Sequence, residues 1–474
     1  IRTVRNQLPD CPELTVARAD GVRARGLPES DRPAPRGVAP VASDYRLLMA
    51  QDTTLQDGTG ELFSTLTAFF TRYGLAFVMV ASYFGSGSVF IASSAGVRYG
   101  YALLWAIVGA VLLGFMAQDM SARLGIFGDS LTDFARRKLG RTGATAVAVL
   151  LSVGCVAWGL ELTAAVGKGV SLLLGDVVGW MPLAVLTALL AIVVGILGYS
   201  YVERLMTGMM LGLLVAYVAV ATAATPDVGA IAAGFVPSVP EAGAVTLVVG
   251  ILGTTALWPN FFLEATLVEE KGWTDASDLS NIRRDLGVGY AVGGLTTVAI
   301  VVCAAAILRP AGITQLDTFL TPGLALADIL GEWAMVLFVV GAVAAAFNSI
   351  VPILWAPAYM IPTALGMDVT SEDRTFRLVY VAGVALSGLS PLVSIFFGLS
   401  VVDMILLFPA YNGVVGLPIT AALLLWAVND RQTMGEHTNG WALNVMNSVL
   451  VLLALYLAVT SAEGVFSAIL GGGL

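Results

Sequence analysis

The sequence predicts an all-α polytopic membrane protein with about eleven transmembrane helices, arranged as a five-plus-five inverted repeat whose first and sixth helices are broken. Three observations lead to this prediction. The 474 residues are 57% hydrophobic and only 12% charged, with a mean hydropathy of +0.86, whereas soluble proteins carry roughly 25% charged residues. Apolar runs of the length that crosses a bilayer recur along the chain. Two of these runs are interrupted by residues that cannot continue a helix.

The chain divides into three parts by composition. Residues 1–48 are rich in Arg, Pro and Asp without an apolar period, so we expect disorder or an upstream extension outside the working protein. The three parts are a polar N-terminal extension over 1–69, which includes this segment, a transporter domain over 70–461 and a C-terminal tail over 462–474. The expected spans are 70–96, 100–122, 143–167, 182–201, 205–224, 244–270, 285–308, 325–350, 376–397, 401–428 and 441–461.

The distribution of Lys and Arg predicts a multi-pass plasma-membrane protein with a cytoplasmic N-terminus. With eleven spans, the outside loops hold only Arg98, Lys168 and Arg309. The inside loops hold thirteen basic residues, which are Arg72, Arg123, Arg136, Arg137, Lys138, Arg141, Arg204, Lys271, Arg283, Arg284, Arg374, Arg377 and Arg431.

The two interruptions lie at 83–89 (Tyr-Phe-Gly-Ser-Gly-Ser-Val) and 253–260 (Gly-Thr-Thr-Ala-Leu-Trp-Pro-Asn). Irregular backbone survives in a bilayer only where protein or a water-filled cavity satisfies its polar groups. Each half that opens with one of these breaks contains five spans. Because an odd number of spans ends on the opposite side of the membrane, the two halves have opposite orientation, which indicates an inverted repeat with a substrate site near the membrane midplane. The alternative is close helix packing through small residues. The predicted substrate-binding residues are Gly85, Ser86, Gly87, Ser88, Thr254, Thr255, Leu257 and Asn260.

Other functional classes find no support in the residues. A net charge of −9 disfavours nucleic acid as a partner. Cys11, Cys155 and Cys303 are scattered, and His437 is the single histidine, so neither a disulfide framework nor a thiolate or histidine metal cluster is expected. No phosphate-binding loop is present, which disfavours ATP-driven transport. We expect no enzymatic activity and no cofactor; the expected partners are a small transported solute and the lipid bilayer, and the sequence does not indicate an oligomeric state.

Several segments resemble the Nramp family of divalent-metal transporters. The run 99–105 (Tyr-Gly-Tyr-Ala-Leu-Leu-Trp) matches the start of that family's second span, and 121–126 (Ser-Ala-Arg-Leu-Gly-Ile) matches its end. Gly198-Tyr199 followed by Glu203 resembles its turn between spans four and five. Residues 260–264 (Asn-Phe-Phe-Leu-Glu) resemble its Asn-Leu-Tyr-Leu-His in span six. The resemblance covers most of 70–460 and implies a secondary transporter that moves a divalent metal by alternating access.

The residues that bind metal in that family are replaced here. Its first break reads Asp-Pro-Gly-Asn, with the Asp and Asn as ligands, where this chain has 85–88 (Gly-Ser-Gly-Ser). Its second break supplies a Met sulfur where this chain has Leu257, and its histidine is replaced by Glu264. In span three Glu161 matches the first member of an acidic pair used for proton movement, while Ala164 replaces the second. The resemblance therefore implies the fold and an atypical site.

Two substrates fit the remaining groups. Neutral oxygens of the breaks and unwound carbonyls can hold a weakly bound or partly hydrated hard cation, for which Ser88, Asn260 and Glu264 are the expected ligands. A soft metal is disfavoured because no methionine lies at the break. Alternatively, free N–H groups at the start of the second half-helix can hold a substrate carboxylate, with Trp258, Phe261 and Phe262 as aromatic walls or as mere packing. This alternative describes an amino-acid or other organic-solute symporter.

Acidic residues inside the membrane are costly and are functional candidates. Glu161 and Glu264 are predicted to carry a coupling proton, or to supply negative charge to the cation. For Asp119, which lies one turn from Arg123, an ion pair with Arg123 is a simpler explanation than a role in transport. For Asp403 the simpler explanation is a position at the start of its span. Spans eight and ten also carry polar side chains, for which hydrogen bonding between helices is the simpler explanation. These residues are Asn348, Ser349, Tyr411 and Asn412.

Overall fold

The computed structural model describes residues 74–316 and 318–470, all within one compact unit, and every regular element among them is a helix. The segments 1–48 and 1–69, for which we expected disorder or a polar extension, lie outside the described residues. The prediction of an all-α membrane protein is confirmed.

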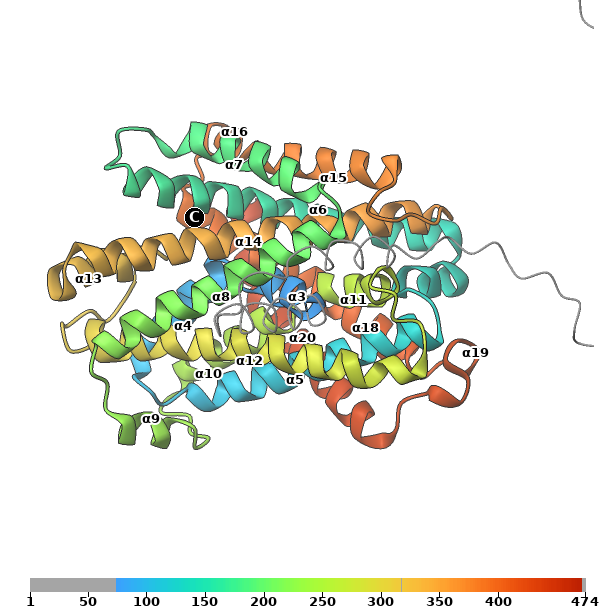
Figure 1. Cartoon of the computed structure of the whole chain (residues 1–474), viewed down its shortest axis with the longest axis horizontal. Helices are drawn as coiled ribbons and strands as arrows, with labels where there is room; N and C mark the ends of the chain where they lie inside the picture. Colours follow the sequence, from blue (N-terminus) through green and yellow to red (C-terminus); the bar gives the residue numbers. More distant parts are fainter. Residues whose placement is uncertain (1–73, 317, 471–474) are drawn as a thin grey trace, which may run out of the picture. The chain divides into compact units, whose positions relative to one another are not determined.

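The first half opens with a broken span made of α3 and α4 (Figure 1). A long α6 follows α5, and the short α9 ends this half. The bounds are α3 Leu75–Tyr83, α4 Ser86–Tyr99, α5 Leu104–Phe127, α6 Leu131–Leu173, α7 Trp180–Gly195, α8 Tyr199–Ala223 and α9 Val228–Gly234.

The second half also opens with an interrupted span, made of α10 and α11. Two of its later spans contain a π-helical turn, η2 after α12 and η3 between α17 and α18. The bounds are α10 Ala242–Thr255, α11 Pro259–Glu270, η1 Ala276–Asp278, α12 Leu279–Cys303, η2 Ala304–Leu308, α13 Thr321–Leu330, α14 Glu332–Ala364, α15 Arg374–Ser387, α16 Ser390–Phe397, α17 Val401–Tyr411, η3 Asn412–Gly416, α18 Leu417–Ala427, α19 Arg431–Met434, η4 Gly435–His437 and α20 Trp441–Leu470.

Nine helices of the described part are long and apolar enough to cross a membrane, and the pair α3 and α4, bent by 65°, raises the number to ten. Helix α7 is apolar but only 16 residues long, short of the roughly 20 that span a bilayer. The count of eleven therefore stays a prediction that depends on α7.

Some predicted boundaries are wrong. The eighth span was expected over 325–350, but α14 begins at Glu332 and continues to Ala364 through Pro352, Pro357 and Pro362. Proline is tolerated in a buried membrane helix because neighbouring helices satisfy the freed backbone groups. The fifth span begins at Tyr199 rather than 205, directly after Gly198, whose φ of 93° favours glycine. Helix α20 reaches Leu470, but its candidate membrane span, Trp441–Thr460, agrees with the predicted 441–461.

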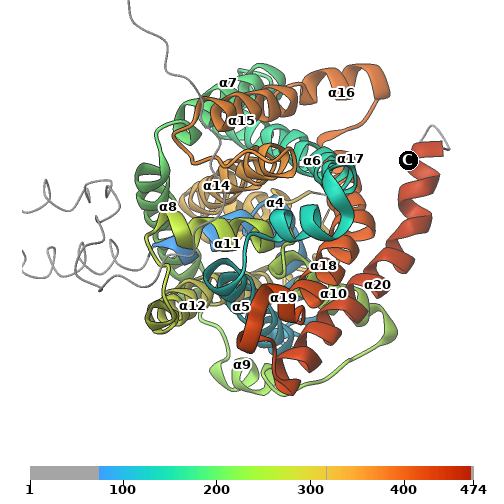
Figure 2. The ribbon, with the colours of Figure 1, turned by 90° about the vertical axis from the view of Figure 1, so that its right-hand side faces the viewer.

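The helices form two packed groups. One contains α6, α7, α14 and α15, and the other contains α4, α5, α10, α11 and α12. Figure 2 shows α7, α14 and α15 on one side of the central α4 and α11, with α5 and α12 on the other side. Helix α3 packs against both α12 and α14. The broken helices thus lie where the two groups meet.

Polar contacts join helix ends at what we call the Lys271 end of the bundle. Lys271 pairs with Glu203 of α8, and the backbone N–H of Ala76 donates to Asp285 Oδ2 of α12 at 2.8 Å. The Glu270 carboxylate accepts hydrogen bonds from Tyr359 and from Ser371. These ends were all predicted to lie inside, and they meet at one end of the bundle; the side of the membrane that this end faces stays a prediction.

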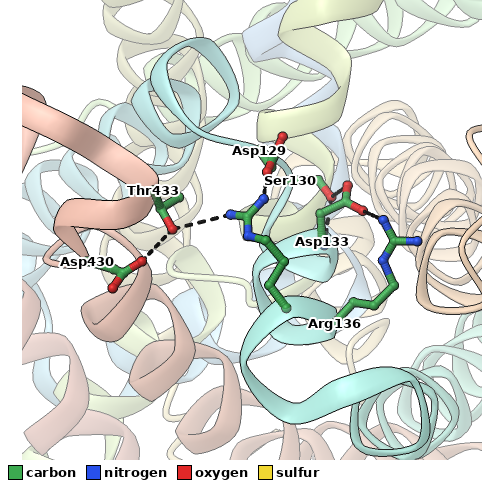
Figure 3. A network of polar contacts seen from close by, with 7 residues as sticks. Asp129, Ser130, Asp133, Arg136, Asp430 and Thr433 are labelled. Atoms are coloured by element: carbon green, nitrogen blue, oxygen red, sulfur yellow. Dashed lines mark hydrogen bonds and ion pairs between the residues drawn. The ribbon is translucent and has the colours of Figure 1, made fainter. Parts of the chain in front are cut away.

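Figure 3 shows a second network at the start of α6. Ser130 is the N-cap, and its hydroxyl accepts from the Asp133 N–H at 3.1 Å. Lys138 donates to Asp430 at 3.0 Å. A hydrogen bond from the Thr433 hydroxyl and the nearby Lys138 ammonium hold the pKa of the Asp430 carboxyl below its usual range. At Gly140 α6 is kinked, with a φ of 72° that a glycine adopts without strain.

We expect Ser130→Ala to lower the thermal unfolding midpoint of the detergent-purified protein. The substitution removes the acceptor for one unpaired N–H at the α6 N-terminus, at a cost of about 1 kcal/mol. The matched control is Thr142→Ala, an exposed position on the same helix. Equal midpoints for the two variants would contradict the capping role.

Candidate functional site

The first break is short and sharp. Only Phe84 and Gly85 lie between α3 and α4, and Gly85 has an extended backbone, with φ −107° and ψ −167°. A Cβ at Gly85 would lie 3.1 Å from Ser349 Oγ and 3.2 Å from Leu162 Cδ2. The sequence indicated a break over 83–89, but α4 already begins at Ser86. The glycine at 85 therefore avoids tight contacts with α6 and α14.

Side chains satisfy the carbonyl groups around this break. Asn260 Nδ2 donates to the Met79 carbonyl at 2.8 Å. The Ser349 hydroxyl donates to the Ala81 carbonyl at 2.7 Å. Within the break, the Ser88 hydroxyl donates to the Tyr83 carbonyl at 2.6 Å. The interruption is thus held by α11, α14 and its own second half, as a bilayer requires.

The second break spans Ala256–Trp258, which is narrower than the predicted 253–260, because α10 continues through Thr255. Pro259 occupies the first turn of α11, where its missing N–H costs no hydrogen bond. Both threonine hydroxyls bond within α10, Thr254 to the Gly250 carbonyl and Thr255 to the Ile251 carbonyl.

A cavity of about 170 Å³ lies between the two breaks. Its wall combines both broken helices with α6, α14, the η3 region and α20. The lining residues are Ser82, Tyr83, Gly85, Gly87, Ser88, Ile91, Trp158, Glu161, Leu162, Gly250, Gly253, Thr254, Ala256, Leu257, Trp258, Ser349, Ile353, Pro409, Asn412, Gly413, Leu417 and Leu457.

Glu161 is the one acidic side chain in this lining, and no Lys, Arg or His of the described residues accompanies it. It is only 2% exposed. The Ser86 hydroxyl, on the first residue of α4, donates to Glu161 Oε1. A carboxylate at a helix N-terminus is stabilised by the partial positive charge there. The cavity therefore carries negative charge when Glu161 is ionised.

The structure brings together six of the ten residues predicted to bind substrate or to carry coupling. Gly85, Gly87, Ser88, Thr254, Leu257 and Glu161 line the cavity. The other four, Ser86, Thr255, Asn260 and Glu264, are buried outside its lining.

Glu264 lies on α11 and is fully buried. Neither of its oxygens has a hydrogen-bond partner among the described residues, and the Oδ1 atoms of Asn260 and Asp285 are likewise without one. Asp285 and Asp119 lie close enough to interact electrostatically with Glu264. A buried polar group without a partner is costly, so these atoms need an occupant such as a proton, a water molecule or an ion.

Two other acids have structural roles. Asp119 was considered as a partner of Arg123, but it pairs with Arg283 of α12 at 2.6 Å. Arg123 instead donates to Asn439 and to the His437 carbonyl. Asp403 forms a capping box with Ser400 at the start of α17, in line with the simpler expectation for it.

Sequence reasoning missed part of the aromatic wall. Trp158 stacks on Trp258 with 6.3 Å between ring centroids, and Trp258 Nε1 donates to Asn412 Oδ1 at 3.1 Å. Trp158 and Glu161 are one helical turn apart and therefore lie on the same face of the helix, and this spacing could have identified Trp158 as part of the wall. Nothing in the sequence indicated Leu457 of α20.

No group of three or more His, Cys, Asp or Glu side chains in 74–316 and 318–470 could hold a metal ion. A cation in the cavity would depend on one carboxylate together with hydroxyl and carbonyl oxygens. Oxygen donors of this kind suit hard cations.

Known proteins resemble this chain over most of its length. A family model described as natural resistance-associated macrophage protein-like (Nramp) matches residues 76–462. The divalent metal cation transporter MntH of Pectobacterium carotovorum subsp. carotovorum (strain PC1) is 27% identical over 402 residues, which cover 83% of this chain and 95% of that protein.

Solved structures share the fold. A manganese transporter of Eremococcus coleocola, in complex with an aromatic bis-isothiourea substituted compound, has a TM-score of 0.70 and 18% identity, over 86% of this chain and 88% of that chain. MhsT, in complex with L-phenylalanine, has a TM-score of 0.55 and 18% identity, over 83% of this chain and 98% of that chain. The fold therefore does not by itself select a substrate.

We expect Gly85→Ala to destabilise the protein, because the added methyl group lies against Ser349 and Leu162. Overpacking of this kind costs about 1–3 kcal/mol. Gly87→Ala is the matched control, because a Cβ there meets no atom within 4 Å. The check is the thermal unfolding midpoint of both variants, and an unchanged midpoint for Gly85→Ala would show that α6 and α14 do not constrain the break.

Proposed function

The chain belongs to the Nramp family, and from this premise we propose that it is a secondary active transporter that carries a divalent metal cation across the plasma membrane by alternating access. Members of this family are transporters and not enzymes. The observation that carries the proposal is the cavity between the two broken helices, with the Glu161 carboxylate in its wall and no basic side chain of the described residues beside it.

The position of Glu161 weighs against the amino-acid alternative. That alternative requires the N-terminus of α4 to receive a substrate carboxylate. Ser86, the first residue of α4, already donates to Glu161. A second carboxylate would meet the first across a small cavity, where like charges repel. A cation is attracted by the same arrangement.

The donor atoms favour a hard cation such as Mg²⁺ or Mn²⁺. No methionine or cysteine of the described residues lines the cavity, and soft metals prefer sulfur ligands. The Ser88 oxygen keeps lone pairs after its proton is donated to the Tyr83 carbonyl. A volume of about 170 Å³ also leaves room for several water molecules, so the cation keeps part of its hydration shell.

We place Asn260 and Glu264 on the path between the cavity and the Lys271 end, which we propose to face the cytoplasm. Their unpartnered oxygens can receive the cation after it leaves Ser88, or hold a coupling proton. At this end the Asp285 contact with Ala76 ties α3 to α12, and the Lys271–Glu203 pair ties the end of α11 to α8. Their release would open the cavity inward. We propose that the N-terminus of the chain is also cytoplasmic.

Calorimetric titration of the detergent-purified protein tests the substrate class. We expect saturable heat from Mn²⁺ or Mg²⁺ and none from a pooled set of amino acids, because an ionised Glu161 gives the cavity negative charge. Heat from an amino acid with silence from both metals would refute the metal proposal. A protein denatured by heat serves as the control for nonspecific metal binding.

Glu264→Gln tests the coupling proposal in proteoliposomes. Because Glu264 lies outside the cavity lining, we expect Mn²⁺ affinity to stay within about twofold, while stimulation of uptake by an inward proton gradient is lost. Glu269→Gln, at an exposed carboxylate on the same helix, should keep both properties. Full stimulation in Glu264→Gln would remove Glu264 from the coupling step.

A further inference from the structure

The cavity lies at the helix breaks, yet neither break contributes an acidic side chain to its lining. A divalent cation that sheds water needs negatively charged oxygen to compensate the loss. The charge must then come from a helix that is not broken. We propose that the Glu161 carboxylate of α6 is a direct ligand of the transported cation, as the substitute for an acid in the first break. This inference rests on the proposed function and specifies its site.

The contacts of Glu161 orient it for this role. Its Oε1 accepts from the Ser86 hydroxyl, whereas Oε2 has no hydrogen-bond partner among the described residues. Ionised carboxylates accept at several lone-pair positions on both oxygens. One oxygen is therefore fixed to α4 and the other is free for the cavity that Glu161 lines.

The packing explains why the charge comes from α6. Helix α6 approaches α15 and η3 closely at two glycines. A Cβ at Gly159 would collide with the Ser387 side chain, and one at Gly154 with the Asn412 side chain. A Cβ at Gly85 would lie 3.1 Å from Ser349 Oγ and 3.2 Å from Leu162 Cδ2, a tight contact to which these side chains would have to adjust by a few tenths of an ångström. With α6 this close, a side chain at 85 would crowd Leu162, whereas Glu161, the neighbour of Leu162 on α6, already lines the cavity.

Glu264 does not meet the same requirement. It is fully buried on α11 and does not line the cavity. Ser88, Thr254 and Ser349 line the cavity but carry only neutral hydroxyl groups. Glu161 is the remaining source of a full negative charge within reach of a cation held there.

The test moves the charge to another helix. Gly87 lines the cavity, and a Cβ there meets no atom within 4 Å, so Gly87→Asp places a carboxylate in open space at the positive end of α4. Mn²⁺ affinity is measured by calorimetry for the full chain, for Glu161→Gln, and for Glu161→Gln combined with Gly87→Asp or with the neutral Gly87→Asn.

We expect Glu161→Gln to weaken Mn²⁺ binding by about tenfold or more, the size of a lost charged interaction. Gly87→Asp should recover most of this loss and Gly87→Asn should not. Binding by Glu161→Gln within about twofold of the unaltered protein overturns the assignment, as does a loss that Gly87→Asp fails to recover. Absence of saturable Mn²⁺ and Mg²⁺ binding in the unaltered protein is a different result, which refutes the proposed function itself.

A measurement on the unaltered protein covers the case in which Glu161→Gln does not fold. A membrane-permeant carbodiimide labels carboxyl groups, and the labelled peptides are quantified by mass spectrometry. Saturating Mn²⁺ should slow the labelling of Glu161 at least about fivefold, because a bound ligand oxygen is withheld from the reagent. Glu269, exposed on α11, is the internal control. Equal labelling of Glu161 with and without Mn²⁺ overturns the assignment.

Discussion

The hydrogen bonding of interrupted backbone inside a membrane is the constraint on which the rest of this structure depends. Lipid offers no donors or acceptors, so each carbonyl freed by a break must find a partner in the protein or in an enclosed cavity. Asn260, Ser349 and Ser88 provide partners for the Met79, Ala81 and Tyr83 carbonyls. These bonds tie α3 to α11 and α14, and they fix the cavity at the meeting point of the two helix groups.

The electrostatics of the cavity follow from that arrangement. Ending α3 and restarting the chain at Ser86 creates a helix N-terminus in the middle of the bundle, which attracts negative charge. The Glu161 carboxylate of α6 lies at this helix N-terminus, where it accepts a hydrogen bond from the Ser86 hydroxyl. The same carboxylate repels an anionic substrate and attracts a cation. In the transport function that we propose, stabilisation of the break and selection of the charge of the substrate are thus two effects of one side chain.

Small residues make the close approach possible. Gly85, Gly154 and Gly159 each lie where a Cβ would press on a neighbouring helix. In membranes such contacts supply van der Waals packing that the lipid cannot replace. At the Lys271 end, charged and polar side chains take over this role. The Lys271–Glu203 pair and the Asp285 contact with Ala76 illustrate this division between a tightly packed middle and a polar end.

The sequence by itself determined the helical membrane fold, the position of both breaks to within a few residues, and the identity of Glu161 as a buried acid, because hydropathy, Gly and Pro placement and intramembrane charge are local properties. Only the tertiary structure decided that Asp119 pairs with Arg283, that α14 continues through three prolines, and that Glu161 lines the cavity while Glu264 does not. These outcomes depend on contacts between residues far apart in the chain, and one sequence carries no record of the distances between them.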